Sequence, residues 1–240
     1  MVGFGTIINA AAIVAGGLCG LLFGKKIKER AQDTLLVCGV SVLFLGIAGT
    51  IEKMMQVENG VLTSGRALFI VVCLALGAAA GELIDLESLF ERFGGWLKIK
   101  TGSAKDTQFV NGFVTASLTV CIGAMAIVGA IEDGVSGDYS VLATKGVLDF
   151  VIVMVMTCTM GKGCIFSAIP VTIWEGLITV LAGFLRPLLN DEILSNISLI
   201  GSILIFCVGI NLVWGKKIRV ANLLPSLIFA VVFALLPISF

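Results

Sequence analysis

Apolar residues in this chain gather into runs of about twenty, and short polar stretches separate each run from the next. A helix of that length crosses the roughly 30 Å of hydrocarbon in a bilayer. We therefore expect an all-α fold, a polytopic transmembrane helical bundle that forms one domain over residues 1–240. The pattern predicts about eight spans, at residues 4–24, 33–51, 64–84, 108–131, 141–161, 163–185, 193–214 and 221–239.

The segment LESLFERFGGWLK, at residues 86–98, has a different pattern. Its leucines and aromatic residues recur at helical spacing among charged ones, which is typical of a helix that lies along the membrane surface. We expect it to connect the third and fourth spans without crossing the bilayer.

The composition supports a membrane protein and narrows its chemistry. Hydrophobic residues make up 58% of the chain and charged residues 13%, whereas soluble domains carry about 25% charged residues. The net charge is zero, so nothing favours nucleic acid as a partner. Histidine, the commonest metal ligand, is absent, and the seven cysteines form no CxxC pair. We therefore expect no metal and no cofactor, and we interpret the cysteines as small packing residues.

Basic residues alternate between the two sides of the predicted bundle. Loops after the odd-numbered spans hold twelve lysines and arginines, and loops after the even-numbered spans hold three, namely Lys53, Arg66 and Arg186. Because positively charged loops stay in the cytoplasm, both termini should lie outside it. The first span lacks a basic leader and runs into glycine-rich sequence, so no cleavable signal is expected.

Residues 49–81 match residues 129–161 without a gap: GTIE aligns with GAIE, and VLTSGRALFIVV aligns with VLATKGVLDFVI. The match predicts that the helix pairs at about 31–84 and 111–161 are two copies of one unit. Residues 163–239 are a candidate third copy, which an offset of five spans would invert. Inverted repeats are typical of transporters, whose sites lie near mid-membrane at the repeat interface.

Glycines recur at intervals of four in the first span, at Gly16, Gly20 and Gly24, and the third span repeats the spacing at Gly77 and Gly81. In lipid, small residues at this spacing let helix backbones touch. We interpret them as packing seams, either within the chain or between copies of it in a homo-oligomer. A pore or a substrate path lined by backbone is the alternative.

Charged residues inside apolar spans form the candidate functional site. Asp149 lies near the middle of the fifth span and Glu175 near the middle of the sixth. A charge at that depth costs about 2.5–3.5 kcal/mol on insertion scales, so such residues face protein or water and are functional by default. Lys145 precedes Asp149 by one turn, so a buried ion pair that fixes helix register is the structural alternative. We expect both carboxylates at one depth, with Lys145 able to neutralise only one of them.

Polar groups flank Glu175 along the sixth span. Thr172 and Thr179 stand three residues before it and four residues after it, and Pro170 frees the carbonyl of Phe166. A carboxylate, two hydroxyls and a free carbonyl on one half-helix suit a dehydrated cation or a proton.

Other polar residues lie in or beside the predicted spans. The fourth span carries a stripe at intervals of four, which we expect to line the route of an ion: Asn111, Thr115 and Thr119. Asn9 and Asn211 are single amides, for which hydrogen bonding between helices is the favoured role. Acidic residues at the outer ends of spans are expected to be solvated, or to form a mouth that concentrates cations: Glu52, Glu132 and Asp133.

The block GFVTASLTVCIGAMAIVGAIEDGVSGDYSVLATKGVLDF at residues 112–150, followed by GKGCIFSAIPV at 161–171, resembles the YdfK/YqgA-type bacterial membrane proteins, a domain of unknown function. The opening GTIINAAAIVAGGLCGLLFGKKIKER, at residues 5–30, is similar to the start of that family. The resemblance covers nearly the whole chain. It implies a multi-pass protein of the bacterial inner membrane, sometimes described as a transport protein, and it supplies no substrate and no site residue.

Together these patterns favour a secondary transporter of a small solute or ion, coupled to a cation or a proton, with the lipid bilayer as its other partner. The charged residues would hold the ion and the threonine stripes would line its route. An ion channel and a non-transporting structural or signalling partner are the alternatives. We expect no enzyme: GVSGDY, at 134–139, resembles the glycine–aspartate motif of membrane aspartyl proteases, but it lies in an outer loop and lacks the first part of the dyad arrangement.

Overall fold

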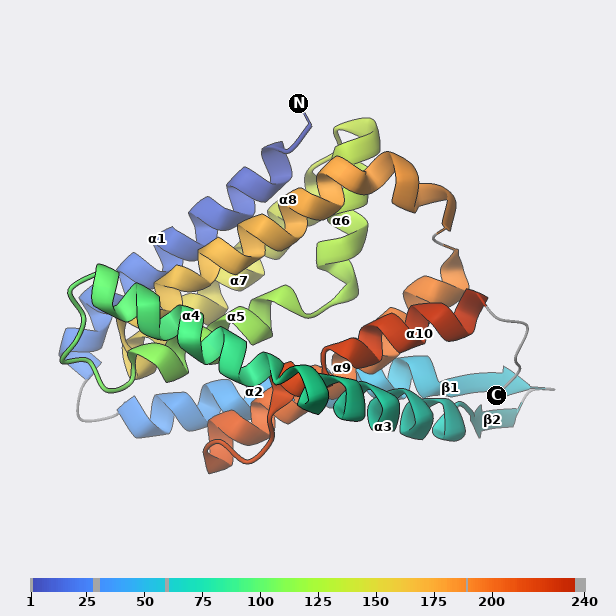
Figure 1. The fold of residues 1–240 in the computed structure, drawn as a ribbon, viewed down its shortest axis with the longest axis horizontal. Coiled ribbons are helices and arrows are strands. Elements are labelled where there is room, and N and C mark those ends of the chain that lie inside the picture. Colours follow the sequence, from blue (N-terminus) through green and yellow to red (C-terminus); the bar gives the residue numbers. More distant parts are fainter. Residues whose placement is uncertain (1, 28–30, 59–60, 189, 236–240) are drawn as a thin grey trace. The chain divides into compact units, whose positions relative to one another are not determined.

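The computed structural model describes residues 2–27, 31–58, 61–188 and 190–235. In these residues the regular structure is helical apart from one short β-hairpin, so the helical fold expected from the sequence is confirmed (Figure 1). The helices fall into two compact units, which are described separately. The first unit comprises residues 1–38 and 89–188, and the second comprises residues 39–88 and 189–240.

The first unit contains α1 (Phe4–Ile27), most of α4 (Leu86–Lys100), α5 (Phe109–Cys121), α6 (Ala124–Ser136), α7 (Ser140–Met160), η2 (Lys162–Ser167), α8 (Ala168–Leu185) and η3 (Arg186–Leu188). The most extensive packing joins α1 to α7, which lie side by side in Figure 1. In addition, α8 packs against both α6 and α1, and the 3-10 helix η2 packs against α5. These contacts place α1, α7 and α8 around a shared interior.

The second unit contains α2 (Ala31–Met54) from Gly39 onward, β1 (Met55–Glu58), β2 (Val61–Ser64), α3 (Ala67–Ile84), α9 (Asp191–Trp214), η4 (Val220–Leu223) and α10 (Pro225–Leu235). The two strands are antiparallel, with Met55 opposite Ser64. In this unit α10 packs against α3 and α9, over a core of apolar side chains that includes Phe69, Leu199 and Ala230.

The helices of the described residues provide five candidate membrane spans, or six with a bent pair. Among the described residues, α1, α3, α7, α9 and the continuous η2–α8 segment are long and apolar enough to cross a membrane. The α5–α6 pair makes a sixth span if it is counted as one bent element. The predicted count of eight stays a prediction, and residues 236–239 of the last predicted span lie outside the described residues.

The predicted span at 108–131 corresponds to two helices, which count as one span if the bent pair is taken together. Helix α5 ends at Cys121, α6 begins at Ala124, and the two are bent by 63°. Between them Gly123 has a φ of 147°, a conformation that a residue with a Cβ rarely adopts. The glycine therefore permits the break, and the break leaves the last carbonyls of α5 without partners inside that helix.

The surface segment predicted at 86–98 is a helix, α4, which extends to Lys100. Within the first unit it packs through Gly94 and Phe93 onto Phe113 of α5, while Trp96 and Ile99 are exposed. Its location along a membrane surface stays a prediction.

Glycines of α1 form a packing seam within the chain. A Cβ on Gly16 would fall on the carbonyl oxygen of Phe150, and a Cβ on Gly20 would fall on that of Met154. The contact partners advance together along both helices, so α1 and α7 run parallel. In the second unit a Cβ on Gly77 would fall on Ser226, and a Cβ on Gly81 would fall on the carbonyl oxygen of Asn222. Other helices of the same chain therefore cover these glycine seams, and self-association stays an untested prediction.

Replacing Gly16 by alanine is expected to lower the free energy of unfolding by about 1–3 kcal/mol, because overpacking forces the backbones of α1 and α7 apart. The matched control is Gly183→Ala in α8, where an added Cβ meets nothing within 4 Å. That control should be neutral or slightly stabilising, since alanine favours a helix. Unfolding of the purified protein in mixed micelles measures both. Equal stability of the two variants would contradict the seam.

The predicted internal repeat stays a prediction. The bounds of α2, when advanced by 80 residues, cover 111–134, close to the 109–136 of the α5–α6 pair. The two regions differ, however: α2 is continuous where α5 and α6 are broken, and the β-hairpin follows α2. Neither the inverted third copy nor the single domain is tested by these elements.

Candidate functional site

A buried group of charged and polar side chains lies in the first unit, where α1, α7 and α8 meet. Helix α7 supplies Lys145 and Asp149, α8 supplies Glu175, and α1 supplies Asn9. Their exposed fractions lie between 0% and 6%. These four residues are called the charged cluster below. The structure thus brings together the three charged residues that the sequence placed inside apolar spans.

Lys145 is the centre of the charged cluster. Its Nζ atom forms a hydrogen-bonded ion pair with Asp149 and lies 3.4 Å from Glu175 Oε1. Nζ also donates to the main-chain oxygen of Val120, at 2.8 Å. Val120 belongs to the last turn of α5, whose carbonyls favour a cation because they carry the negative end of the helix dipole. The break at Gly123 therefore gives the buried ammonium a main-chain partner.

Glu175 is fully buried, and only one of its two carboxylate oxygens has a hydrogen-bond partner among the described residues. Its Oε1 atom accepts a hydrogen bond from Asn9 Nδ2 at 2.8 Å, and the same oxygen faces Lys145. Its Oε2 atom is buried and has no hydrogen-bond partner among the described residues. A carboxylate oxygen in that position costs free energy unless a proton or a cation reaches it.

The charges of the cluster do not balance. With both carboxylates ionised, the one ammonium leaves a net charge of −1, counted over Lys145, Asp149 and Glu175. A net charge in a low-dielectric interior is unfavourable, so the interior favours the uptake of one positive charge. Lys145 lies between the two carboxylates, but its single positive charge can balance only one of them.

Apolar side chains close the charged cluster on each helix. One turn away from its members stand Leu142 and Val153 of α7, Ile13 of α1, and Val171 and Ile178 of α8, all buried. These side chains exclude bulk water, and a low dielectric strengthens every interaction among the charges.

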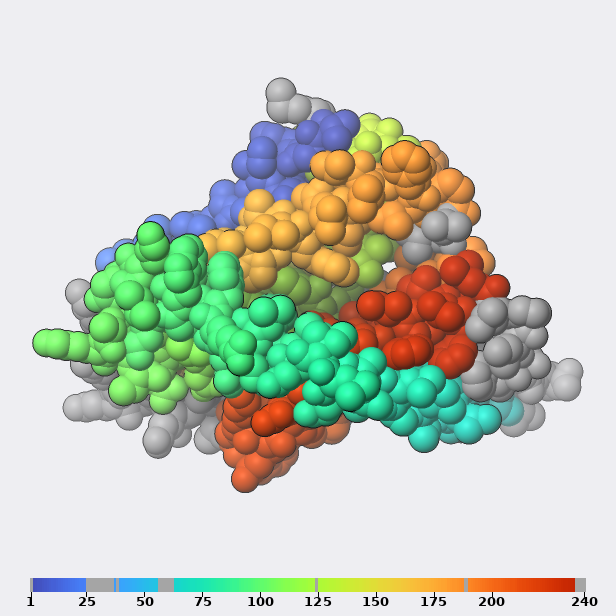
Figure 2. All heavy atoms as spheres, viewed as in Figure 1, coloured from blue at the N-terminus to red at the C-terminus, as the bar shows by residue number. Residues whose placement is uncertain are grey.

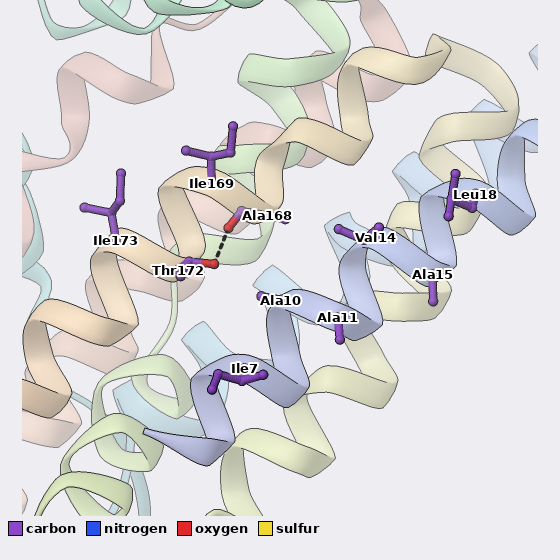
Figure 3. A pocket seen from close by; sticks show the side chains of 10 residues that line it. All are labelled: Ile7, Ala10, Ala11, Val14, Ala15, Leu18, Ala168, Ile169, Thr172 and Ile173. Carbon is purple, nitrogen blue, oxygen red and sulfur yellow. Dashed lines mark hydrogen bonds between the residues drawn. The ribbon is translucent and has the colours of Figure 1, made fainter. Parts of the chain in front are cut away.

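The two threonines beside Glu175 have different surroundings. Thr179 is 5% exposed, and its hydroxyl has no hydrogen-bond partner among the described residues. Thr172 instead lines an apolar groove between α1 and α8, where its hydroxyl donates to the Ala168 carbonyl at 2.6 Å (Figure 3). The surfaces of α1, in blue, and α8, in orange, also meet on the face drawn in Figure 2. Thr172 therefore does not join the site, contrary to the prediction.

The predicted role of Pro170 is also wrong. Pro170 lies in the first turn of α8, where a helix has no partner for the missing N–H, so the proline causes no kink beside Glu175. Phe166 belongs to η2, and its ring packs against Phe109 of α5. The group around Glu175 is completed by α1 rather than by a carbonyl of its own helix.

The polar stripe of α5, which the sequence predicts to line an ion route, does not join the charged cluster. Asn111 is exposed, Thr115 is half-buried, and the hydroxyl of buried Thr119 donates to the Thr115 carbonyl at 2.7 Å. What α5 contributes to the cluster is the Val120 carbonyl. Hydropathy spacing could not reveal that contact, because it depends on the break at Gly123.

The two single amides have different roles. Asn9 links α1 to α8, as expected of an amide between helices, and in doing so it joins the charged cluster. Asn211 of α9 instead binds the segment that follows its own helix, through the N–H groups of Lys217 and Ile218 and the Ile218 carbonyl. Asn9 is the site residue that sequence patterns missed, since 166 residues separate it from Glu175.

Asp133 is buried rather than solvated, which corrects the expectation for this acid. Its carboxylate accepts hydrogen bonds from the N–H groups of Gly3, at 3.1 Å, and Gly5, at 2.9 Å. Gly3 directly precedes α1 and Gly5 lies in its first turn, where the helix dipole favours a negative charge. Nearby in sequence, Asp138 is exposed between α6 and α7, and the backbone hydrogen bond from Ser140 lowers the pKa of its carboxyl. Asp138 thus keeps its charge at neutral pH.

Proteins similar to this chain confirm the resemblance seen in its sequence. The model of a family described as "Protein of unknown function (DUF554)" matches residues 4–235. The uncharacterized membrane protein YdfK of Bacillus subtilis (strain 168) is 32% identical over 226 residues, which cover 94% of this chain and 93% of YdfK. The uncharacterized protein YqgA of Escherichia coli (strain K12) is 26% identical over 231 residues, which cover 94% of each chain. No solved structure matches.

Proposed function

The chain belongs to the DUF554 family, and we propose that it is a secondary transporter that moves a small solute or ion across the bacterial inner membrane. A proton or another cation is the coupling ion of this transporter. The long apolar helices of this chain and the name of its relative YdfK both indicate an integral membrane protein, in which such a transporter would work.

One observation carries the proposal: a buried charged cluster that lacks one positive charge, beside a broken helix. Ionisable groups inside membrane spans are costly, and where they persist they are typical of ion pathways and proton relays. A discontinuous helix whose freed carbonyls face a charged site is a recurring feature of secondary transporters. Here the Val120 carbonyl at the end of α5 accepts a hydrogen bond from Lys145, and Glu175 Oε2 has no hydrogen-bond partner among the described residues.

The mechanism follows from the charge balance. Uptake of one cation at Glu175 neutralises the charged cluster, so the loaded form needs no compensating charge and can change conformation within the bilayer at low cost. Loss of the cation restores the net charge of −1 and favours the conformation open to water. The glycine seam between α1 and α7 gives these helices smooth contact surfaces along which they can shift.

A non-transporting structural role is the rival that a specific observation favours. Lys145 alone connects α5, α7 and α8, so the charged cluster could serve only to fix their packing. A channel is the rival within the transport class and would show rapid, uncoupled flux. Flux into reconstituted vesicles, measured for protons, alkali cations and amino acids, separates these functions. Glu175→Gln is the diagnostic variant.

Eight spans with both termini outside the cytoplasm are expected, because twelve basic residues lie in loops of one side and three in loops of the other. The measurement is labelling of single cysteines with an impermeant maleimide, in a background without the native cysteines. Asp138→Cys should react in intact cells, whereas Lys105→Cys, equally exposed, should react only after permeabilisation. Labelling of the Lys105 position in intact cells would contradict this orientation.

A further inference from the structure

Hydroxyl groups in the helices of this chain usually bond to their own backbone. Side-chain oxygens of this kind donate to the carbonyl four residues earlier, and they include Thr50, Ser117, Thr119, Ser136, Thr144, Thr172 and Ser202. This arrangement is the ordinary way for a helical serine or threonine to satisfy its hydroxyl. A buried hydroxyl that leaves this bond unmade therefore needs another partner.

Four buried hydroxyls have no hydrogen-bond partner among the described residues: Thr6, Thr157, Thr179 and Ser226. Of these, Thr179 and Thr6 lie within about one helical turn of a member of the charged cluster. Thr179 is 5% exposed and Thr6 is 4% exposed, and neither hydroxyl has a partner among the described residues. The carbonyl that Thr179 would ordinarily use is that of Glu175, one turn earlier. Thr179 therefore stands on the face of α8 that carries the Glu175 carboxylate, and its hydroxyl does not bond to that carbonyl.

The two threonines lie on the same side of the Asn9–Glu175 hydrogen bond. Gly17 of α1 faces Ile165, which precedes α8, and Asn9 faces Glu175, so α1 and α8 run antiparallel. Thr6 precedes Asn9 by three residues, and Thr179 follows Glu175 by four. Both hydroxyls therefore lie about one turn from the carboxylate, toward the beginning of α1.

Helix α6 closes this end of the site. A Cβ on Gly134 would meet the Thr179 carbonyl, and a Cβ on Gly5 would meet Asp133 Oδ2 at 3.0 Å. The start of α1, the end of α6 and Thr179 thus converge one turn beyond Glu175. In the described residues, the buried oxygens without a hydrogen-bond partner around this point are Glu175 Oε2, Thr179 Oγ, Thr6 Oγ and Asn9 Oδ1, contributed by two facing helices.

We infer that Glu175, Thr179 and Thr6 bind one dehydrated alkali cation between α1 and α8. The assignment rests on the proposed function, for which it names the coupling ion. A hard cation exchanges its water shell for oxygen ligands, and the site offers a carboxylate and two hydroxyls. A single positive charge also brings the charged cluster from −1 to zero, which selects a monovalent ion.

A divalent metal does not fit the same residues. No three histidine, cysteine, aspartate or glutamate side chains in the described ranges are placed to hold a metal ion. A second positive charge would also leave the cluster with a net charge of +1 beside Lys145. A proton on Oε2 would satisfy that oxygen alone, and it would leave the two threonine hydroxyls without a partner.

Thermal unfolding of the detergent-purified protein tests the site without relying on transport. Sodium chloride replaces choline chloride at constant ionic strength and constant pH. The midpoint temperature of the wild type is expected to rise with sodium and to saturate, since a ligand that binds only the folded state stabilises it. Thr179→Val should raise the apparent Kd by about tenfold, through the loss of one ligand.

Thr172→Val is the matched control. It removes the same hydroxyl from the same helix, but that hydroxyl faces the groove and bonds to Ala168, so the sodium response should equal that of the wild type. Thr6→Val tests the α1 side and should weaken the response as Thr179→Val does. If Thr179→Val fails to fold, Thr179→Ser, which keeps the hydroxyl, should retain the response.

The possible outcomes separate this site from the proposed transport. A midpoint that depends on pH but not on sodium overturns the sodium site and leaves proton coupling, so the proposed function survives. Equal sodium responses of Thr179→Val and Thr172→Val overturn the site as well. A sodium response that Thr179→Val removes, in a protein that moves no solute into vesicles, supports the site and overturns the transport function.

Discussion

Flux of the transported solute into reconstituted vesicles is expected to fall to the level of protein-free vesicles when Glu175 is replaced by glutamine. Glutamine keeps the shape of the side chain and an oxygen that can accept the hydrogen bond from Asn9. It removes the negative charge, however, so that Lys145 and Asp149 alone form a neutral pair. The charged cluster then has no reason to take up a cation, and coupling is lost.

Folding should survive the Glu175→Gln change, because the substitution removes a net buried charge instead of creating one. The unfolding midpoint in detergent is therefore expected to equal or exceed that of the wild type measured without sodium. Glu192→Gln is the matched control, since it makes the same chemical change at an exposed position at the start of α9. Unchanged flux in the Glu175→Gln protein would contradict an ion-coupling role for this carboxylate.

Lys145→Met is expected to be the most destabilising single change in the charged cluster, at about 3–5 kcal/mol of the free energy of unfolding. It leaves two buried carboxylates without a countercharge and removes the donor to the Val120 carbonyl. The triple variant Lys145→Met, Asp149→Asn, Glu175→Gln should recover most of this loss, because no charge is then stranded. Unfolding in mixed micelles measures the whole series.

Asp149→Asn is expected to lower the free energy of unfolding by less than the sequence alone predicts. Pairing at four residues alone predicts that this change strands the ammonium of Lys145, but the structure gives that ammonium a second carboxylate, Glu175, at 3.4 Å. Lys105→Met, at an exposed position, controls for the loss of a lysine as such. If Lys145→Met proved no more harmful than Lys105→Met, the charged cluster would have no role in stability.

Several features of the protein could be predicted from local sequence, because they depend on residues within one element. Runs of apolar residues identified the long helices, since the hydrocarbon thickness sets their length. Lys145 and Asp149 form the ion pair that their spacing allows, because a separation of four residues places them on one helix face wherever the helix lies. The glycine spacing of α1 likewise predicted a seam, although it could not name α7 as the partner.

Only the tertiary structure decided which of these features form a site. Thr172 and Thr179 share a stripe on α8, yet one faces a groove and the other the interior, because a neighbouring helix covers such a stripe only where it packs closely. Asn9 reaches Glu175, and Asp133 reaches the start of α1, across more than a hundred residues. The backbone conformation at Gly123 divides into two helices a stretch of the sequence that is continuously apolar. Periodicity defines the face of a helix, but contacts between distant elements depend on packing and backbone conformation, which no local pattern encodes.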